Sequence, residues 1–353
     1  MNMRVCFKTK RNTEEISICQ DENILFAGLK AGLALPHECA SGTCGTCQGQ
    51  PLTEDSLIDN WKHAPGKKHM PKDSNRILMC QSSCSQDTNI RLFGPLKKQT
   101  DEYPRPNYFD AVMTSSTREN DDVISFKLKL DRNFTFIAGQ FIMLRPDELS
   151  GWRAYSICNT KLSSDEIELV LKKMPNGGFS NWLFKYSNFE KPLKAFGPLG
   201  KASLKPKSGD TDIIAIAGGS GIAGIISVLE DALKTNHLKS FKANIFFGLR
   251  DKETSFFLER LNDLVLQSKN SLQVTVGYSE YTPKDNIKKP FPCISFKAGW
   301  IHEIALNEIR SKNLLEGTTF FIAGPPVMVD KTEEKLKEEL NIKPENIRID
   351  RFG

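Results

Sequence analysis

The stretch CASGTCGTC, from Cys39 to Cys47, places three cysteines within nine residues. Such a run can hold a zinc ion, form disulfides or ligate an iron–sulfur cluster, and each chemistry predicts a different role for the chain. The segment MNMRVCFKTKRNTEE at the start of the sequence lacks the apolar core of a secretory signal peptide. We therefore expect a cytoplasmic protein in a reducing environment, where disulfides are disfavoured.

The spacing of the cysteines favours an iron–sulfur cluster. Cys39-x4-Cys44-x2-Cys47, followed much later by Cys80, is the spacing typical of plant-type [2Fe–2S] sites. The residues between the first three cysteines are small, so the loop can wrap closely and point backbone N–H groups at the sulfurs. The sequence therefore predicts a site made of four thiolates.

Two alternatives stay open at this point. A zinc ion would use Cys44 and Cys47 with Cys80 and Cys84, which leaves Cys39 unused and does not explain the small residues of the loop. Cys84 also competes with Cys80 as the fourth ligand of a cluster. We prefer Cys80, because the run RILMC predicts an apolar strand that ends at this cysteine.

The remaining cysteines do not form a set. A Rieske cluster needs histidine ligands in pairs, and His37 is the only histidine near the loop. Four cysteines lie in strand-like runs, where we expect them to be small buried apolar residues: Cys6, Cys19, Cys158 and Cys293.

The composition is that of a multidomain globular protein. The chain has 353 residues, of which 39% are hydrophobic and 26% charged, and this length predicts two or three domains. No apolar run approaches the roughly 18 residues that span a bilayer. The net charge is +5 with both signs interspersed. The basic run around Lys67, Lys68 and Lys72 lacks aromatic residues for base stacking, so we expect a solvated loop and no nucleic-acid binding.

The first 93 residues predict a small α+β domain. MRVCFK and EEISIC alternate apolar and polar residues around a polar turn, which predicts a β-hairpin. ENILFAGLKAGL has leucines at helical spacing and predicts a helix that ends near Gly32. NIRLF is expected to close this domain as a strand.

Two further domains follow a linker. Residues 94–105 are rich in proline and mixed charge, which is typical of a linker. Residues 106–207 contain short alternating strands, which predict an antiparallel β-barrel. Residues 208–353 contain nearly all-apolar runs such as DIIAIAG and TTFFIAG, separated in places by helical patterns such as IAGIISVLEDALK. They predict an α/β domain with a parallel, doubly wound sheet.

Residues 1–93 resemble a plant-type ferredoxin domain with the β-grasp fold. The resemblance implies a one-electron carrier whose iron ligands are Cys39, Cys44, Cys47 and Cys80.

A flavin site is indicated by motifs in the second domain. Arg153-x-Tyr155-Ser156 is followed by Gly177-x-x-Ser180 before a helical run, and helix starts bind phosphate. With FIAGQF and FGPLG, in this order, the motifs resemble the flavin domain of the ferredoxin–NADP reductase superfamily. The resemblance implies a six-stranded barrel that holds FAD. It places Tyr155 on the isoalloxazine ring and Ser156 near the flavin N5, as the catalytic candidates, and the pyrophosphate at Arg153, Gly177, Gly178 and Ser180.

A nicotinamide site is indicated in the third domain. AIAGGSGIAG follows a predicted strand and opens a helix, and it resembles the GGTGxAP loop of the same superfamily, with Gly224 in place of proline. AGPPVM resembles the C-G-P-P-x-M segment, with Ala323 in place of the cysteine that helps to place the nicotinamide ring in that family. Hydride transfer needs no ionisable group there. The implied cofactor contacts are Gly218, Gly219, Gly221, Gly324 and Pro325.

The identity of the dinucleotide depends on a few charges. Glu280 follows the strand LQVTVGY at a position where NADP-binding relatives often carry an arginine, and its carboxylate would repel a 2′-phosphate. Arg250 could attract a 2′-phosphate and so favours NADPH, but the carboxylate of Asp251, the next residue, weakens this argument. We therefore expect NADH. Phe352, near the end of the chain, is a candidate to cover the flavin ring, and packing within a last strand explains it about as well.

The three parts together predict an electron-transfer enzyme. Their order resembles the reductase components of bacterial multicomponent oxygenases, closest to the toluene monooxygenase reductases. The resemblance implies an enzyme that passes electrons from NADH through FAD to a [2Fe–2S] cluster and on to an oxygenase component or its small carrier protein. The expected acceptor is a soluble di-iron monooxygenase, and the reductase is expected to be a monomer that binds no membrane.

Two other functions remain open. The same order of domains occurs in reductases that serve deoxysugar synthesis. A function of a different class is a zinc-stabilised binding module with a vestigial reductase fold. Visible flavin and iron–sulfur absorption would distinguish this module from an electron-transfer enzyme.

Overall fold

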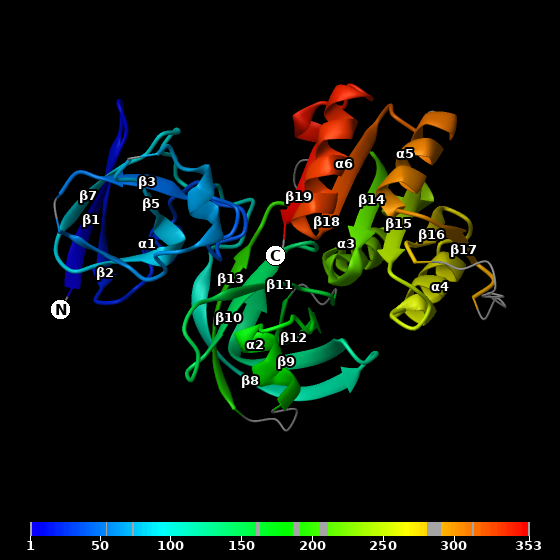
Figure 1. The fold of residues 1–353 in the computed structure, drawn as a ribbon, viewed down its shortest axis with the longest axis horizontal. Coiled ribbons are helices and arrows are strands. Elements are labelled where there is room, and N and C mark those ends of the chain that lie inside the picture. The colour runs from blue at the N-terminus through cyan, green and yellow to red at the C-terminus, as the bar shows by residue number, and fades with distance from the viewer. Residues whose placement is uncertain are drawn as a thin grey trace. The chain divides into compact units, whose positions relative to one another are not determined.

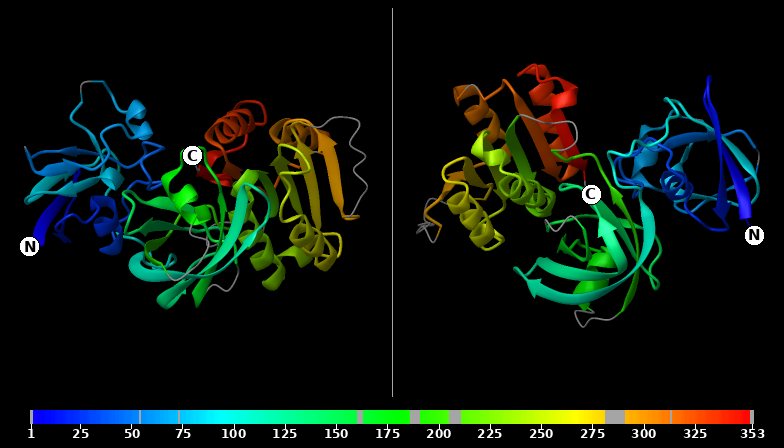
Figure 2. Two further views of the ribbon diagram at one scale, coloured as in Figure 1. Left: turned by 60° about the horizontal axis from the view of Figure 1, so that its bottom comes forward. Right: turned by 180° about the vertical axis from the view of Figure 1, so that it is seen from behind.

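Three main sheets organise the chain, and the computed structural model in Figures 1 and 2 describes most of it. The described residues are 2–53, 55–72, 74–159, 163–185, 191–204, 211–280, 291–312 and 314–351. They pack as two compact units. Unit 1 contains 1–110, 142–154 and 193–199, and unit 2 contains 111–141, 155–192 and 200–353. The border between the units therefore runs through the strands of the predicted flavin barrel.

The first sheet confirms the α+β domain. Strands β1 (Asn2–Lys8) and β2 (Thr13–Cys19) form the predicted antiparallel hairpin, and β7 (Thr88–Arg91) pairs in parallel with β1. The strand order is β2-β1-β7-β3-β5, with a separate pair β4-β6. The other elements are β3 (Gln48–Pro51), β4 (Leu57–Asp59), β5 (Ile77–Leu78), β6 (Ser82–Cys84), helix α1 (Ile24–Lys30) and the 3₁₀ turns η1 (Pro65–His69) and η2 (Met79–Gln81).

The second sheet has six strands in the order β11-β10-β13-β8-β9-β12. The β8–β9 and β9–β12 pairs are antiparallel, in accord with the alternating pattern of the sequence. The elements are β8 (Asn107–Arg118), β9 (Val123–Thr135), β10 (Phe141–Pro146), β11 (Arg153–Ser156), β12 (Ser163–Lys172), β13 (Pro192–Leu199) and helix α2 (Gly178–Lys185).

The third sheet is parallel throughout, with the order β17-β16-β15-β14-β18-β19. Its strands are β14 (Asp212–Gly218), β15 (Ala243–Leu249), β16 (Leu272–Tyr278), β17 (Ile294–Ala298), β18 (Thr318–Gly324) and β19 (Ile347–Arg351). The helices are α3 (Ile222–Lys234), α4 (Leu258–Gln267), α5 (Ile301–Lys312) and α6 (Pro326–Glu338), with short 3₁₀ turns η3 (Gly219–Gly221), η4 (His237–Lys239) and η5 (Pro344–Asn346).

The central strand β14 shows why this sheet is apolar on both faces. Ile213 and Ala215 pack in a core with residues of α3 and α4, whereas Ile214 and Ile216 pack in a second core with residues of α5 and α6. Figure 2 shows the two helical layers on opposite faces of the sheet. Because successive side chains of a strand point to opposite faces, a strand between two helical layers must be apolar along its whole length.

Some expectations differ from the structure. Of the four cysteines expected to be buried in strand-like runs, only Cys158 is buried; Cys19 lies exposed at the end of β2, and Cys6 and Cys293 are half-buried. Cys6 points to the face of β1 opposite the buried Val5 and Phe7, and Cys293 precedes β17. Within the expected linker, Lys98 forms a β-bridge with Leu33, which lies just after α1.

The helices of the described residues are short. None of them is both long enough and apolar enough to cross a membrane.

Candidate functional site

The cysteine loop and the turn η2 bring the four predicted iron ligands together. Cys39, Cys44 and Cys47 lie between α1 and β3, and Cys80 lies in η2, directly after the two-residue strand β5. Cys39, Cys47 and Cys80 are buried and Cys44 is half-buried. Backbone N–H groups of Ser41 and Cys44 donate to the Cys39 sulfur at 3.4 Å. These contacts match the N–H···S hydrogen bonds expected for a loop that wraps a cluster.

The four thiols form two pairs. A hydrogen bond with Cys44 lowers the pKa of Cys39 to about 4, and the same contact raises the pKa of Cys44. A hydrogen bond with Cys47 raises the pKa of Cys80. Among the described residues, no three His, Cys, Asp or Glu side chains converge on one point as a mononuclear metal requires. Two pairs of thiolates suit two bridged irons, so the donor set fits a [2Fe–2S] cluster.

Cys84 lies in a different environment. It belongs to β6 and pairs with Leu57 of β4. Burial, followed by the nearby charge of Asp87, raises the pKa of Cys84 to about 12. No other cysteine contributes to this shift, whereas Cys47 and Cys39 both act on Cys80. The structure thus groups Cys80, and not Cys84, with the loop.

The basic run next to the cysteine loop is more than a solvated surface. Gly66 in η1 donates its N–H to the Gly42 carbonyl at 2.8 Å, and a Cβ atom on Gly66 would lie 2.7 Å from the Gly45 nitrogen. Only glycine fits such a close approach. Lys68 and Lys72 are exposed as expected, and Lys67 forms an ion pair with Asp59.

Two contacts near the loop have no counterpart in the sequence motifs. Asn23 caps α1 by accepting the Phe26 N–H at 3.1 Å, and its side-chain amide donates to the Cys80 carbonyl at 2.6 Å. The Gln81 side-chain amide donates to the Cys80 sulfur at 3.6 Å. An asparagine before a helical run is a recognisable N-cap signal, but its contact with Cys80 spans 57 residues of sequence.

A cluster of aromatic rings, which we call the aromatic seam, joins α1 to strands of the second sheet within unit 1. The Phe26 ring stacks on Phe196 with 4.2 Å between centroids, and Trp152 meets Phe26 edge-on at 5.3 Å. Tyr108 packs on Phe196 at 4.8 Å. Phe26 and Phe196 are fully buried. The aromatic seam consists of these four residues.

The flavin candidates lie on β11 and at the start of α2. Arg153 begins β11, where its guanidinium donates to the Trp152 carbonyl and lies 5.9 Å from the Trp61 ring. Tyr155 packs 5.3 Å from Phe179, and Ser156 is buried. The predicted motif RAYS therefore forms a regular strand, β11.

Hydrogen bonds within the turn before α2, the predicted phosphate site, fix its conformation. The Ser180 hydroxyl accepts from the Met174 N–H at 3.1 Å and donates to the Gly177 carbonyl at 3.3 Å. Gly178 opens α2, and no atom of the described part of the chain would lie within 4 Å of a Cβ atom there. These hydrogen bonds give the turn before α2 a defined conformation.

The two nicotinamide motifs meet at the carboxyl edge of the third sheet. Gly218 ends β14, and Gly219 and Gly221 form the turn η3 that leads into α3. A Cβ atom on Gly221 would lie 2.6 Å from the Ala323 carbonyl, and one on Gly324 would lie 3.0 Å from Gly218. The backbones of the two turns therefore touch, as their adjacent strands β14 and β18 require.

The structure also relates the flavin strand to the nicotinamide turn. A Cβ atom on Gly224, in the first turn of α3, would lie 3.4 Å from the Ser156 side chain and 3.7 Å from Asp350. Both residues belong to unit 2. Ser156 thus lies beside the helix that begins at the glycine-rich turn. Pro325 precedes α6 at the end of β18.

The residues that bear on dinucleotide choice lie at neighbouring strand ends. Glu280 is exposed after β16, and its N–H donates to the Arg250 carbonyl at 2.8 Å. Arg250 follows β15 and lies 3.9 Å from Asp122 and 3.8 Å from Asp251, so two carboxylates offset its charge. Phe352 lies outside the described residues.

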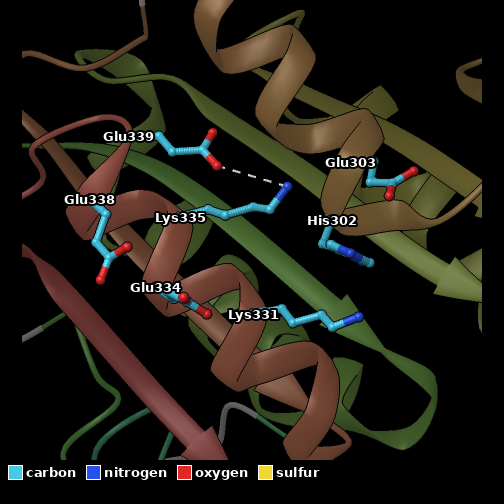
Figure 3. Close-up of a pocket in the computed structure, with 7 residues that line it drawn as sticks. All are labelled: His302, Glu303, Lys331, Glu334, Lys335, Glu338 and Glu339. Atoms are coloured by element: carbon cyan, nitrogen blue, oxygen red, sulfur yellow. Dashed lines mark ion pairs between the residues drawn. The ribbon is translucent and has the colours of Figure 1, made fainter.

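A pocket of about 270 Å³ lies between α5 and α6 (Figure 3). It is lined by His302, Glu303, Lys331, Glu334, Lys335, Glu338 and Glu339. The His302 side chain is buried, and its Nδ1 has no hydrogen-bond partner among the described residues. None of the predicted site residues lines this pocket, so it belongs to a different part of the third domain.

Three regions of the chain match known domain families. Residues 7–85 match the 2Fe-2S iron–sulfur cluster binding domain, residues 110–204 the oxidoreductase FAD-binding domain, and residues 215–334 the oxidoreductase NAD-binding domain. The protein is therefore an NAD(H)-dependent oxidoreductase of the ferredoxin–NAD(P) reductase class, with a [2Fe–2S] cluster and FAD as its redox groups.

Several relatives align with nearly the whole chain. The ferredoxin–NAD(+) reductase component of an alkene monooxygenase system from Xanthobacter autotrophicus is 29% identical, covering 94% of this chain and 96% of the relative. The phenol hydroxylase P5 protein of Acinetobacter pittii is 26% identical, covering 96% and 91%. A solved structure, a ferredoxin reductase in carbazole 1,9a-dioxygenase, superposes with a TM-score of 0.81 at 25% identity, covering 100% and 99%. These relatives favour the electron-transfer function over both alternatives.

Proposed function

We propose that this protein is the reductase component of an oxygenase system. It takes a hydride from NADH and delivers electrons one at a time to an oxygenase component, such as a soluble di-iron monooxygenase, or to its small carrier protein. The observation that carries this proposal is the pairing of four thiols in a domain followed by flavin and nucleotide domains, together with oxygenase-system relatives that span the chain. We also propose a cytoplasmic monomer with the domain limits 1–93, 106–207 and 208–353.

The residues have separate tasks in this proposal. Cys39, Cys44, Cys47 and Cys80 hold the cluster. When bound, FAD supplies the exchange between two-electron and one-electron chemistry, and the protein orients the groups and excludes water. FAD contacts are Arg153, Tyr155, Ser156, Gly177, Gly178, Ser180 and Phe352, and nicotinamide-nucleotide contacts are Gly218, Gly219, Gly221, Glu280, Gly324 and Pro325.

The cysteine assignment provides the sharpest test. Cys80→Ser should remove the visible absorption of the cluster and abolish NADH-dependent reduction of cytochrome c, used here as a protein acceptor. The same variant should still reduce a dye that takes electrons from flavin, because NADH binding and the reduction of FAD do not involve the cluster. Cys84→Ser is the matched control and should keep the cluster. If Cys84→Ser lost the cluster and Cys80→Ser kept it, the ligand assignment would be wrong.

The order of transfer tests the function itself. In anaerobic stopped-flow with NADH, flavin absorption should bleach before that of the cluster. A cluster that is reduced first, or a purified protein without either absorption after reconstitution, would contradict the proposal.

The dinucleotide preference has its own test. Glu280→Arg should shift the ratio of kcat/KM values toward NADPH, because it replaces a repelling charge with an attracting one. Glu259→Arg, at an exposed position of α4, is the control and should leave the ratio unchanged.

A further inference from the structure

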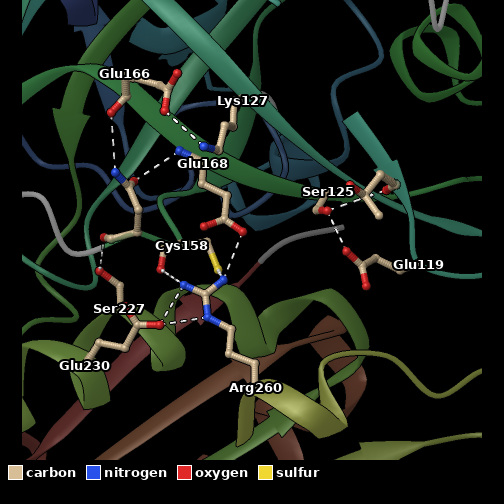
Figure 4. Close-up of polar contacts among 11 residues, drawn as sticks. Glu119, Ser125, Lys127, Cys158, Glu166, Glu168, Ser227, Glu230 and Arg260 are labelled. Atoms are coloured by element: carbon tan, nitrogen blue, oxygen red, sulfur yellow. Dashed lines mark hydrogen bonds and ion pairs between the residues drawn. The ribbon is translucent and has the colours of Figure 1, made fainter. Parts of the chain in front are cut away.

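Arg260 of α4 lies between two carboxylates from different parts of unit 2 (Figure 4). Its Nη1 donates to Glu168 on β12 at 2.9 Å, and its Nε donates to Glu230 on α3 at 2.7 Å. β12 belongs to the flavin sheet, whereas α3 and α4 belong to the nucleotide domain. The guanidinium therefore joins the two domains that must exchange a hydride.

The same guanidinium holds the chain segment that follows the flavin strand. Its Nη2 donates to the Cys158 carbonyl at 3.3 Å, and its Nη1 lies 3.4 Å from the Cys158 sulfur. Cys158 comes two residues after Ser156. We call Arg260, Glu168, Glu230 and Cys158 the arginine clamp.

Asn159, the residue after Cys158, also ties this segment to β12 and α3. Its side-chain oxygen accepts the Glu168 N–H at 3.1 Å, and its carbonyl accepts the Ser227 hydroxyl of α3 at 3.0 Å. The segment that continues from the RAYS motif is thus bound to both α3 and α4. Because α3 begins at the glycine-rich turn, these contacts join the segments that directly follow the two cofactor motifs.

The charges of the arginine clamp are well shielded. The side chains of Arg260, Glu168 and Glu230 are 25%, 22% and 19% exposed. Burial alone would lower the pKa of Arg260, but its neighbours Cys158, Glu168 and Glu230 together raise it, so the arginine stays protonated. A planar guanidinium holds several acceptors in fixed directions, which a lysine cannot do.

We propose that Arg260 is a positioning residue for hydride transfer. It fixes β11, which carries Tyr155 and Ser156, against the helix that follows the nicotinamide turn. Hydride transfer needs reacting atoms about 3–3.5 Å apart, and a displacement of about 1 Å can cost on the order of 100-fold in rate. This inference rests on the proposed function, because it assumes that NADH reduces FAD between these two motifs.

Arg260→Lys in the holoenzyme tests the proposal. With saturating NADH under anaerobic conditions, flavin reduction should slow by about 10- to 100-fold. The later transfer from flavin to cluster, started by photoreduction, should keep its rate. Arg310→Lys on α5, an exposed arginine paired with Glu339, is the matched control and should change neither rate.

A second readout does not depend on activity. Cys158 is fully buried, so its alkylation, followed by peptide mass spectrometry, reports opening of the arginine clamp. Arg260→Lys should speed this labelling at least about 10-fold with and without cofactors, and Arg310→Lys should not. Glu230→Gln provides a second variant if Arg260→Lys folds poorly.

The outcomes separate the two proposals. Faster labelling with unchanged flavin reduction would show that the arginine clamp only holds the fold, and would overturn the positioning role. Unchanged labelling and an unchanged rate would overturn it as well. If wild-type flavin were not reduced by NADH at all, the proposed function would fail instead.

Discussion

The aromatic seam of unit 1 and the arginine clamp of unit 2 join neighbouring domains by opposite means. The aromatic seam is made of four rings, of which Phe26 and Phe196 are fully buried. None of its members is charged, and the nearest cations, Lys30 and Arg145, lie over the faces of the half-buried Tyr108 and Trp152 rings. The arginine clamp is made of directed hydrogen bonds between a guanidinium and two carboxylates. Ring packing depends on buried area and tolerates small shifts, whereas directed hydrogen bonds from a planar guanidinium fix orientation.

The difference matches the two transfers that the proposed function requires. Electron transfer to the cluster forms no bond between the groups, so a packed contact that sets approximate distance is sufficient. Hydride transfer moves an atom between two rings and needs an aligned near-attack geometry. A directional contact beside Ser156 is therefore better placed to control the first transfer than an apolar one.

The largest expected effect comes from breaking the aromatic seam. Phe26→Ala removes a fully buried ring, and should lower the free energy of unfolding of the cluster-bearing part by about 3–5 kcal/mol. Urea titration followed by the loss of cluster absorption measures this change. Phe93→Ala is the control in the same domain; its ring is 48% exposed and should cost less than about 1 kcal/mol. Equal losses for both variants would show that the aromatic seam adds no stability.

Breaking the arginine clamp should have a smaller effect on stability. Glu168→Gln removes one charged acceptor of Arg260, and should cost about 1.5–3 kcal/mol in the unfolding of unit 2. Glu166→Gln, two residues away on β12, is the control. Its ion pair with Lys127 at 3.2 Å is exposed and should contribute less than about 1 kcal/mol. Near-UV circular dichroism during urea unfolding compares them, and a smaller loss for Glu168→Gln than for its control would contradict the prediction.

Asn23 connects α1, the helix that carries Phe26 of the aromatic seam, to the cluster ligand Cys80. Asn23→Ala removes the cap of α1, at a cost of about 1 kcal/mol, and also the hydrogen bond to the Cys80 carbonyl. Asn23→Ser keeps a capping oxygen but is too short to keep both contacts. Both variants should release the cluster faster on dilution with a chelator, while only Asn23→Ala should destabilise the helix. Normal cluster retention in both would show that the Cys80 contact has no role.

The sequence predicted the parts whose signals are local. Cys39, Cys44 and Cys47 are close in sequence, and the strand–turn–helix pattern around Gly218 and Gly221 needs only neighbouring residues. The three fold classes followed from periodicity and were confirmed.

The contacts that join domains were not predictable in the same way. Arg260 reaches Cys158 across 102 residues, and its local pattern is that of an ordinary amphipathic helix. Phe26 likewise reads as a core position of α1, and its partner Phe196 lies far along the chain. Such pairs depend on tertiary structure, which a single sequence does not encode in any short motif.

The smallest expected effect concerns His302, which belongs to neither the aromatic seam nor the arginine clamp. Burial lowers the pKa of His302 below its ordinary value of 6.5; Lys331 and Lys335 add to this, and Glu303 opposes it. Protonation is therefore harder in the folded state, so the contribution of His302 to stability is present above about pH 6.5 and is lost as the pH falls toward its folded pKa.

Replacing this histidine should remove that dependence. Between pH 7.5 and 5.5, Tm of the wild type should fall by up to about 3 °C more than Tm of His302→Asn. Unfolding of the cluster-bearing part in the same two proteins should coincide at both pH values, because His302 lies in unit 2 and the aromatic seam carries no group that titrates in this range. A pH dependence that persists in His302→Asn would show that the responsible proton binds to another group.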